Sequence, residues 1–353
     1  MTTTHEVALL RLVAQRVVGP LPEAPVEVVR RLGALQGQDL PGALLSVALR
    51  TADGTRAGVG AALDAGQVVR SWPVRGTLHL VAADDLSWLI ALLGPRVLAG
   101  APARRAQLGI TDASISHARL IAVEALAGGR RLRRKELLGA LAAGGVETAG
   151  QRGYHLLWYL SQSATLCLGP MDDGEQCFVL LDEWLPPRPS MDADAALAEL
   201  AERFFRGHGP ATVKDLARWA GLRITEARAG LSAAWDGLAR VEVDGIEYFL
   251  DPATPDLLAS CREEARGTFL LPGFDEFVLG YGERGAILDP AFADRIVPGG
   301  NGIFRPTVVH DGRIIGTWQW SGRGATRTVT ATPFTEFTRE VAEAVPRLAA
   351  AFS

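Results

Sequence analysis

Residues 210–250 carry the pattern that most constrains the fold of this chain of 353 residues. Apolar side chains at 213, 216 and 217 share one face of a short predicted helix, Gly221 supplies a turn, and a second helix is predicted over residues 224–235. Two short strands follow, joined by Asp244-Gly245, a dipeptide typical of tight hairpins. Helix, turn, helix and hairpin is the winged-helix order, although a generic helical hairpin packed on a β-ribbon would give the same pattern.

The same order is predicted twice more along the chain. Residues 131–182 indicate a helix, a glycine turn, a longer helix and a hairpin. Residues 26–81 indicate two helices, an extra helical stretch and a β-ribbon. A basic cluster at residues 130–135 lies at the start of the second copy. It either contacts a phosphate backbone or is simply the solvent-exposed start of a helix.

The character of the chain changes at Thr268, where short strand-like runs with Gly, Pro and Asn begin. Residues 310–313 form a strong hairpin signal, and residues 336–350 form an amphipathic helix. We interpret this part as a small barrel or curled sheet closed by that helix. The predicted fold class is α+β, with winged-helix domains at residues 1–125, 126–190 and 191–262 and a small C-terminal β-barrel with its helix at residues 263–353.

Composition excludes several classes of protein. Hydrophobic residues make up 48% of the chain and charged residues 22%, which is typical of a folded globular protein. No apolar run reaches the roughly 18 residues that a membrane span needs, and the N-terminus does not resemble an export signal. The three cysteines lack CxxC spacing, so we expect neither a disulfide framework nor a zinc site. The cytoplasm is the expected compartment, and no metal is expected.

The charge of the chain bears on its partners. A net charge of −4 argues weakly against nucleic acid. Nearly all of the 36 basic residues are arginines, which suit bidentate phosphate contacts, although a GC-rich genome would give the same bias. Charge alone therefore does not decide whether the chain binds DNA.

Three strings carry a resemblance to a known family: SWPVRGTLHLV at residues 71–81, LPGFDEFVLGYGERGAIL at residues 271–288 and NGIFRPTVVHDGRIIGTW at residues 301–318. Together they resemble blocks of the winged-helix DNA-binding family that includes the bacterial AlkZ and YcaQ DNA glycosylases, and the resemblance extends over nearly the whole chain. It implies three tandem winged-helix domains and a β-barrel arranged as a C-shaped clamp. The implied partner is double-stranded DNA carrying alkylated bases, with no cofactor and no obligatory protein partner. The implied reaction is hydrolysis of the N-glycosidic bond of purines substituted at N7 or N3, and the sequence leaves open whether interstrand crosslinks are also unhooked.

Members of this family carry a Gln-Φ-Gln or Gln-Φ-Asp motif after an early helix, where Φ is an apolar residue. This chain has Gln36-Gly37-Gln38 at the matching place, with glycine at the middle position. The resemblance implies that Gln36 and Gln38 are catalytic, and the alternative is a solvated loop between helices. Asp39 is either an accessory carboxylate or the N-cap of the helix that starts at Leu40.

The reaction that the resemblance implies needs no strong acid. An alkylated purine is cationic and therefore a good leaving group, so an enzyme has to place a water molecule and stabilise an oxocarbenium-like sugar. A glutamine amide can hold water through its acceptor oxygen and its two donor hydrogens. Neither Lys135 nor Lys214, the chain's two lysines, lies near the motif in sequence, so a monofunctional hydrolysis is expected in place of Schiff-base chemistry.

Further candidates for DNA contact lie on predicted ribbons and turns: Arg75, His79, Tyr281, Arg284, Asn301 and Arg305. Arg75 and His79 are an even number of residues apart, so they share one side of a strand that runs unbroken. Tyr281 and Arg284 occupy a glycine-rich turn that could protrude into a groove. Core packing, ribbon capping or turn formation are the alternatives for these residues.

Two other functions compete with a glycosylase. Winged helices by themselves imply DNA binding, so a noncatalytic DNA-binding protein or transcription regulator is the main alternative. A hydrolase that uses Asp275 and Glu276 as a carboxylate pair is the other. Because these two acids are adjacent, they cannot face one side of a straight strand, which makes them a poor catalytic pair.

Overall fold

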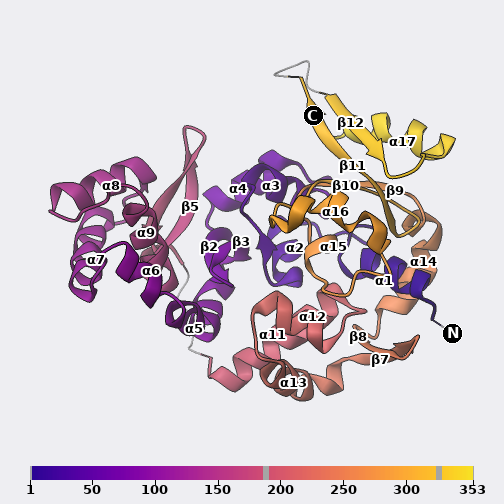
Figure 1. Ribbon diagram of the computed structural model, residues 1–353, viewed down its shortest axis with the longest axis horizontal. Helices are drawn as coiled ribbons and strands as arrows, with labels where there is room; N and C mark the ends of the chain where they lie inside the picture. Colours follow the sequence, from indigo (N-terminus) through magenta and orange to yellow (C-terminus); the bar gives the residue numbers. More distant parts are fainter. Residues whose placement is uncertain (1, 186–190, 323–327, 353) are drawn as a thin grey trace. The chain divides into compact units, whose positions relative to one another are not determined.

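A computed structural model describes residues 2–185, 191–322 and 328–352 of the chain (Figure 1). It mixes helices with antiparallel strands and divides into two compact units. The first unit joins Met1–Arg56 to Ala198–Ser353, and the second comprises Ala57–Leu197. Within the described part of the chain, no helix is long and apolar enough to cross a membrane.

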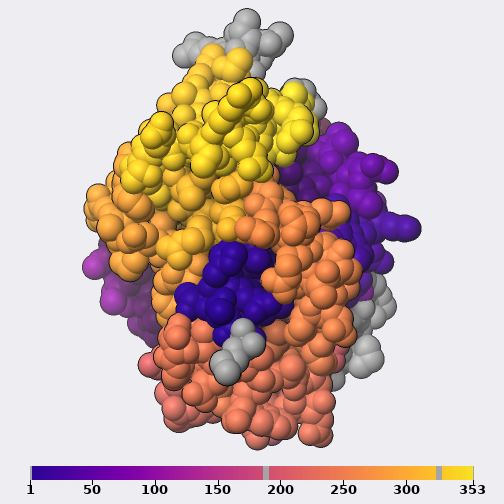
Figure 2. All heavy atoms as spheres, turned by 90° about the vertical axis from the view of Figure 1, so that its right-hand side faces the viewer, coloured from indigo at the N-terminus to yellow at the C-terminus, as the bar shows by residue number. Residues whose placement is uncertain are grey.

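The N-terminal segment lies in the core of the first unit. Helix α1 (Thr4–Ala14) starts at an N-cap, Thr3, whose side chain accepts the N–H of Glu6. Its residues from Val7 onward are buried, and the helix packs on α14 (Thr254–Ala265). Figure 2 shows the indigo N-terminal segment enclosed by orange and salmon segments of the C-terminal half. The remaining N-terminal elements of this unit are α2 (Pro25–Leu32), β1 (Leu35–Gln36) and α3 (Leu40–Ala48).

The pattern of residues 210–250 is confirmed as helix, turn, helix and hairpin. Gly221 ends the first of the two helices in the left-handed conformation, and Asp244 and Gly245 both have positive φ, as a tight hairpin turn requires. Phe204 of the preceding helix and Trp219 of the first of these helices are buried and pack against each other. The elements are α11 (Ala193–His208), α12 (Val213–Ala220), α13 (Ile224–Ala233), β7 (Ala239–Val243) and β8 (Ile246–Leu250).

The C-terminal part forms an open sheet, which corrects the expected barrel. Its strand order is β12-β11-β10-β9, all antiparallel, and in the described residues the edge strands β12 and β9 do not pair with each other. Helix α17 (Arg339–Ala350) covers the sheet through Val341 and Val345, which pack in one core with Trp318. The strands are β9 (Thr268–Leu271), β10 (Thr307–His310), β11 (Arg313–Ser321) and β12 (Thr328–Pro333).

One expected strand is a helix instead. Residues 276–279, which we interpreted as strand-like, form α15 (Glu276–Leu279), because Asp275 caps its N-terminus by accepting the N–H of Phe277 at 2.9 Å. Short helices also occupy the following loop: η2 (Pro290–Phe292), α16 (Ala293–Ile296) and η3 (Pro298–Gly300). A further 3-10 turn, η1 (Trp235–Gly237), joins α13 to β7.

The second unit contains another helix, turn, helix and hairpin module. Strand β4 pairs with β6, which pairs with β5, and the helices pack on this ribbon around Trp72 and Phe178, whose rings stack with centroids 6.4 Å apart. The module comprises α7 (Asp112–Leu126), β4 (Leu132–Arg133), α8 (Arg134–Ala143), α9 (Arg152–Gln162), β5 (Leu166–Asp172) and β6 (Glu175–Leu180). The unit also holds α4 (Arg56–Asp64), β2 (Val68–Val74), β3 (Thr77–Ala82), α5 (Ala83–Ala99), α6 (Pro102–Gln107) and α10 (Leu181–Trp184).

The order α2, β1, α3, α4, β2, β3 along the N-terminal third matches the order of the second module. The helices and hairpins predicted from the sequence are therefore present in all three places. The division into three winged-helix domains with the boundaries given above, and their C-shaped arrangement, stay predictions.

Candidate functional site

The Gln36–Gln38 loop connects β1 to α3 in the first unit. Gln36 ends the strand and is half-buried, Gly37 is buried, and Gln38 is exposed. Gly33, with a φ of 73°, ends α2 just before the strand, and Pro41 in the first turn of α3 fixes the point where the chain becomes helical again. The loop thus presents one exposed and one half-buried amide side chain between two short rigid elements.

Asp39 is exposed and occupies the N-cap position of α3, but its side chain makes no capping hydrogen bond. A Cβ built on Gly42 would lie 2.6 Å from Oδ2 of Asp39, so the carboxylate sits over the space that this glycine leaves open. The N-cap role is therefore not fulfilled by the Asp39 side chain. Its carboxylate stays beside the two glutamines as the only acidic group in residues 36–39.

A buried carboxylate, Glu276, holds the backbone of this loop. Its Oε1 accepts a hydrogen bond from the backbone N–H of Gln36 at 3.2 Å. Its Oε2 accepts a hydrogen bond from the indole N–H of Trp219 at 2.9 Å and lies 3.3 Å from Nε2 of His208. Glu276 is 1% exposed and His208 is fully buried, with its ring stacked on Phe204. Contacts with Trp219 of α12 and His208 of α11 thus hold the carboxylate in place beside the N–H of Gln36.

The neighbouring acid, Asp275, holds the helix that follows the loop. Its carboxylate pairs with the Arg50 guanidinium through contacts of 2.8 and 2.9 Å and accepts a hydrogen bond from the Ser46 hydroxyl at 2.6 Å. Burial alone would raise the pKa of Asp275, but the Arg50 guanidinium and these hydrogen bonds outweigh it and hold the pKa below its ordinary value. Arg50 also donates to the backbone oxygen and the side-chain oxygen of Gln15, which ties α1 to the same cluster.

The comparisons with known proteins support the fold and identify the family. A family model described as DNA glycosylase AlkZ-like matches residues 29–353, which include the Gln36–Gln38 loop and the two acids. The chain belongs to this family. The DNA glycosylase class that the resemblance implied is therefore confirmed, and the noncatalytic regulator is set aside.

A sequence relative and a solved structure, both from Streptomyces sahachiroi, are similar to this chain. An interstrand DNA cross-link repair glycosylase is 28% identical over 341 residues, which cover 92% of this chain and 88% of the relative. The solved structure of the DNA glycosylase AlkZ matches with a TM-score of 0.79 at 24% identity, covering 99% of this chain and 95% of that one. The structural match shows the fold.

Two predicted DNA contacts are corrected by their burial. His79 lies in β3 with no exposed surface, and its Nδ1 is 2.8 Å from the backbone oxygen of Thr77. Tyr281 is also fully buried: its hydroxyl donates to the backbone oxygen of His208 at 2.7 Å and accepts from Gln15. Arg11 stacks on the Tyr281 ring at 3.7 Å, so this tyrosine belongs to the core and not to a protruding hairpin.

Other candidates lie closer to solvent. Arg75 is exposed in the turn between β2 and β3, so it does not share an unbroken strand with His79 as we expected. Asn301 and Arg305 are exposed in the loop before β10, where Asn301 accepts the N–H of Ile303. Arg284 is half-buried, and its Nε donates to Val278. Burial, together with Arg218, lowers the pKa of Arg284 to about 10, so it stays charged at neutral pH.

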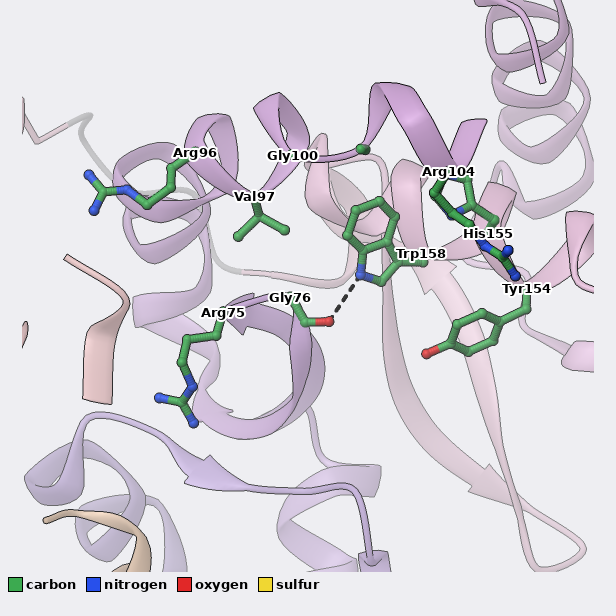
Figure 3. A pocket seen from close by; sticks show the side chains of 10 residues that line it. Arg75, Gly76, Arg96, Val97, Gly100, Arg104, Tyr154, His155 and Trp158 are labelled. Carbon is green, nitrogen blue, oxygen red and sulfur yellow. Dashed lines mark hydrogen bonds between the residues drawn. The ribbon is translucent and has the colours of Figure 1, made fainter. Parts of the chain in front are cut away.

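The second unit holds a cationic pocket that the sequence did not indicate beyond Arg75. The pocket has a volume of about 510 Å³, and Figure 3 shows Arg75 and Arg96 at one side, Arg104 and His155 at the other, and Trp158 between them. Trp158 donates to the backbone oxygen of Gly76 at 3.0 Å, which ties the hairpin turn to α9. Burial, then Arg104 and Arg105, lower the pKa of His155, so the positive charge of the pocket comes from arginines.

Proposed function

We propose that this chain is a monofunctional DNA glycosylase that hydrolyses the N-glycosidic bond of purines alkylated at N7 or N3 in duplex DNA. The observation that carries the proposal is the family match, which runs through the Gln36–Gln38 loop to the end of the chain. Gln36 and Gln38 bind and orient the attacking water, with Gln38 directed more toward it. No cofactor and no obligatory protein partner are part of the proposal.

The chemistry of the loop suits a cationic leaving group. Alkylation weakens the glycosidic bond, so the remaining work is to place water and to face developing positive charge on the sugar with oxygen dipoles. Gln38 is exposed, where it can meet a nucleotide, and the backbone of Gln36 is held by Glu276. Asp39 adds a carboxylate at the same loop.

The name of the Streptomyces sahachiroi relative extends the proposed substrate range. That protein is an interstrand DNA cross-link repair glycosylase, and it covers 92% of this chain. We include in the proposal that this chain also unhooks crosslinks formed through alkylated purines. Unhooking such a crosslink and releasing a simple alkylated base both require cleavage of the N-glycosidic bond, so one site can serve both reactions.

The proposal is tested with purified full-length protein and duplex DNA that contains a single N7-methylguanine. We expect release of the free base and an abasic site that breaks only after heat or alkali. Borohydride should trap no covalent enzyme–DNA adduct, because the mechanism uses water and not an amine. DNA binding without any base release from a panel of simple and crosslinked alkylated duplexes would overturn the proposal.

Gly42→Ala tests the accessory role of Asp39. The new Cβ would lie 2.6 Å from Oδ2 of Asp39, so the carboxylate has to move, while the helix itself tolerates alanine well. We expect base release to fall by up to ~10²-fold, because a displacement of about 1 Å at a reacting centre costs that much. Asp39→Asn, which keeps the shape and removes the charge, should lower release as well. If both variants release base at the wild-type rate, Asp39 has no part in the reaction.

The cationic pocket predicts a contribution to DNA affinity. Arg75→Ala and Arg104→Ala should each weaken binding of undamaged duplex and reduce the slope of log K against log salt by about one unit for each phosphate that is no longer neutralised. Fluorescence anisotropy over a range of salt concentrations measures both quantities. Arg339→Ala, at an arginine on α17 that pairs with Glu343, is the control and should change neither.

A further inference from the structure

Two adjacent carboxylates hold the chain on either side of the Gln36–Gln38 loop. Glu276 accepts the N–H of Gln36 on the side of β1. Asp275 binds Ser46 and Arg50 on the side of α3. Because adjacent side chains leave the backbone in different directions, one short segment contacts both the backbone of Gln36, 240 residues away in sequence, and the C-terminal half of α3, the helix that follows the loop.

Both oxygens of the Glu276 carboxylate accept hydrogen bonds from N–H groups. One oxygen faces the N–H of Gln36, and the other faces the indole N–H of Trp219. His208 lies against the second oxygen, and its ring packs on Phe204 and Trp219 and fills the space that Gly280 leaves open. A group with 1% exposure that is held in this way is placed to orient a neighbour and not to exchange protons with substrate.

We propose that Glu276 is a positioning residue for base excision, which acts by fixing the backbone of Gln36 and hence the origin of the Gln36 side chain. This inference rests on the proposed function of the Gln36–Gln38 loop. Catalysis by oriented amides depends on their direction, because a misplaced dipole no longer faces the charge that develops on the sugar. The loop itself contains a glycine, so an outside support for its backbone is needed.

An amide cannot replace this carboxylate. In Glu276→Gln, one end of the side chain is an acceptor oxygen and the other is an NH₂ donor. Because Trp219 and His208 both lie against one oxygen of the native group, we expect the amide oxygen to stay on that side, which turns the NH₂ donor toward the N–H of Gln36. Glu276→Asp keeps the charge but is one methylene shorter, so it cannot keep both contacts in place.

The experiment compares Glu276→Gln with Asp215→Asn in the full-length protein. Asp215 is a matched control because it is 1% exposed and accepts backbone N–H groups, those of Gly282 and Thr212, without a contact to the loop. Single-turnover release of N7-methylguanine, affinity for undamaged duplex and hydrogen exchange of the Gln36 amide are measured for both variants and for wild type.

We expect Glu276→Gln to lower the single-turnover rate by ~10²-fold with unchanged DNA affinity, since a small misplacement of a reacting group has an effect of that size. Its Gln36 amide should exchange faster than in wild type. Asp215→Asn should lose stability while keeping both the rate and the exchange of Gln36. Glu276→Asp should lie between wild type and Glu276→Gln in rate, because it can retain the contact to Gln36 at the expense of Trp219.

Three outcomes would overturn the inference: unchanged Gln36 exchange in Glu276→Gln, an unchanged rate, or an equal drop in rate in Asp215→Asn, which would reveal a general effect of stability. Failure of the proposed function is recognised separately. In that case wild type itself releases no base, and the exchange of the Gln36 amide alone decides whether Glu276 fixes the loop.

Discussion

Replacing both Gln36 and Gln38 with alanine is expected to lower the release of N7-methylguanine by ~10³-fold or more. Loss of one preorganised polar group at a site that stabilises developing charge costs about 10²–10³-fold in rate. In the proposed mechanism the two amides orient the same water molecule, so their effects should not multiply. Gln38→Ala alone should therefore account for most of the decrease in the double variant.

The measurement is the single-turnover rate at saturating enzyme, with DNA affinity determined in parallel. Both amides belong to a short loop at the surface, so the fold and the affinity for undamaged duplex should survive the change. Gln67→Ala, at another exposed glutamine, is the matched control and should release base at the wild-type rate. Undiminished release by the double variant would show that other groups hold the water.

Local chemistry in the sequence predicted the hairpins well. Asp244-Gly245 and Asp311-Gly312 both form turns with positive φ, because this dipeptide tolerates the conformation that a two-residue hairpin imposes. Helices with clear periodicity were also found in the expected places. The segment at residues 276–279 was not, because its apolar residues look like a strand, whereas in the structure Asp275 caps a short helix whose Glu276 is held by distant residues.

Periodicity could not tell which face of an element is inside. Arg75 and His79 were expected on one side of a strand, but the chain turns at Arg75, and His79 faces the core. Tyr281 was likewise expected in a protruding turn and is buried under Arg11. The burial of Tyr281 depends on contacts with Arg11 of α1 and His208 of α11, which lie far away in sequence.

The candidate site was found only in part. Resemblance identified Gln36, Gln38 and Asp39, whereas nothing local to them indicates Glu276. The adjacency of Asp275 and Glu276 argued that they are not a catalytic pair, and their separate partners in the structure agree with that argument. What adjacency could not reveal is that Glu276 holds the backbone of Gln36 while Asp275 holds the C-terminal half of α3, because these contacts arise only from the tertiary structure.

Asp275→Asn is expected to lower the free energy of unfolding by about 3–5 kcal/mol, because it leaves the buried guanidinium of Arg50 without its charged partner. Both side chains of this pair are fully buried. Urea unfolding of the full-length protein measures the change. Glu343→Gln, the same type of substitution in an exposed pair on α17, is the control and should leave the midpoint unchanged.

The effect of Asp275→Asn should also depend on pH, with a sign that follows from the lowered pKa of Asp275 in the folded state. A carboxyl whose folded pKa is depressed stabilises the protein fully above its unfolded value of about 3.9, and this stabilisation is lost as the pH falls through the folded value. The stability difference between wild type and Asp275→Asn should therefore be constant at neutral pH and shrink only in acid. A difference that grew on acidification would show that Asp275 is protonated in the folded protein and that the pair with Arg50 is not ionic. Because Asp275 also accepts the hydroxyl of Ser46 in α3, the helix that follows the Gln36–Gln38 loop should lose this support in the same pH range in which stability falls.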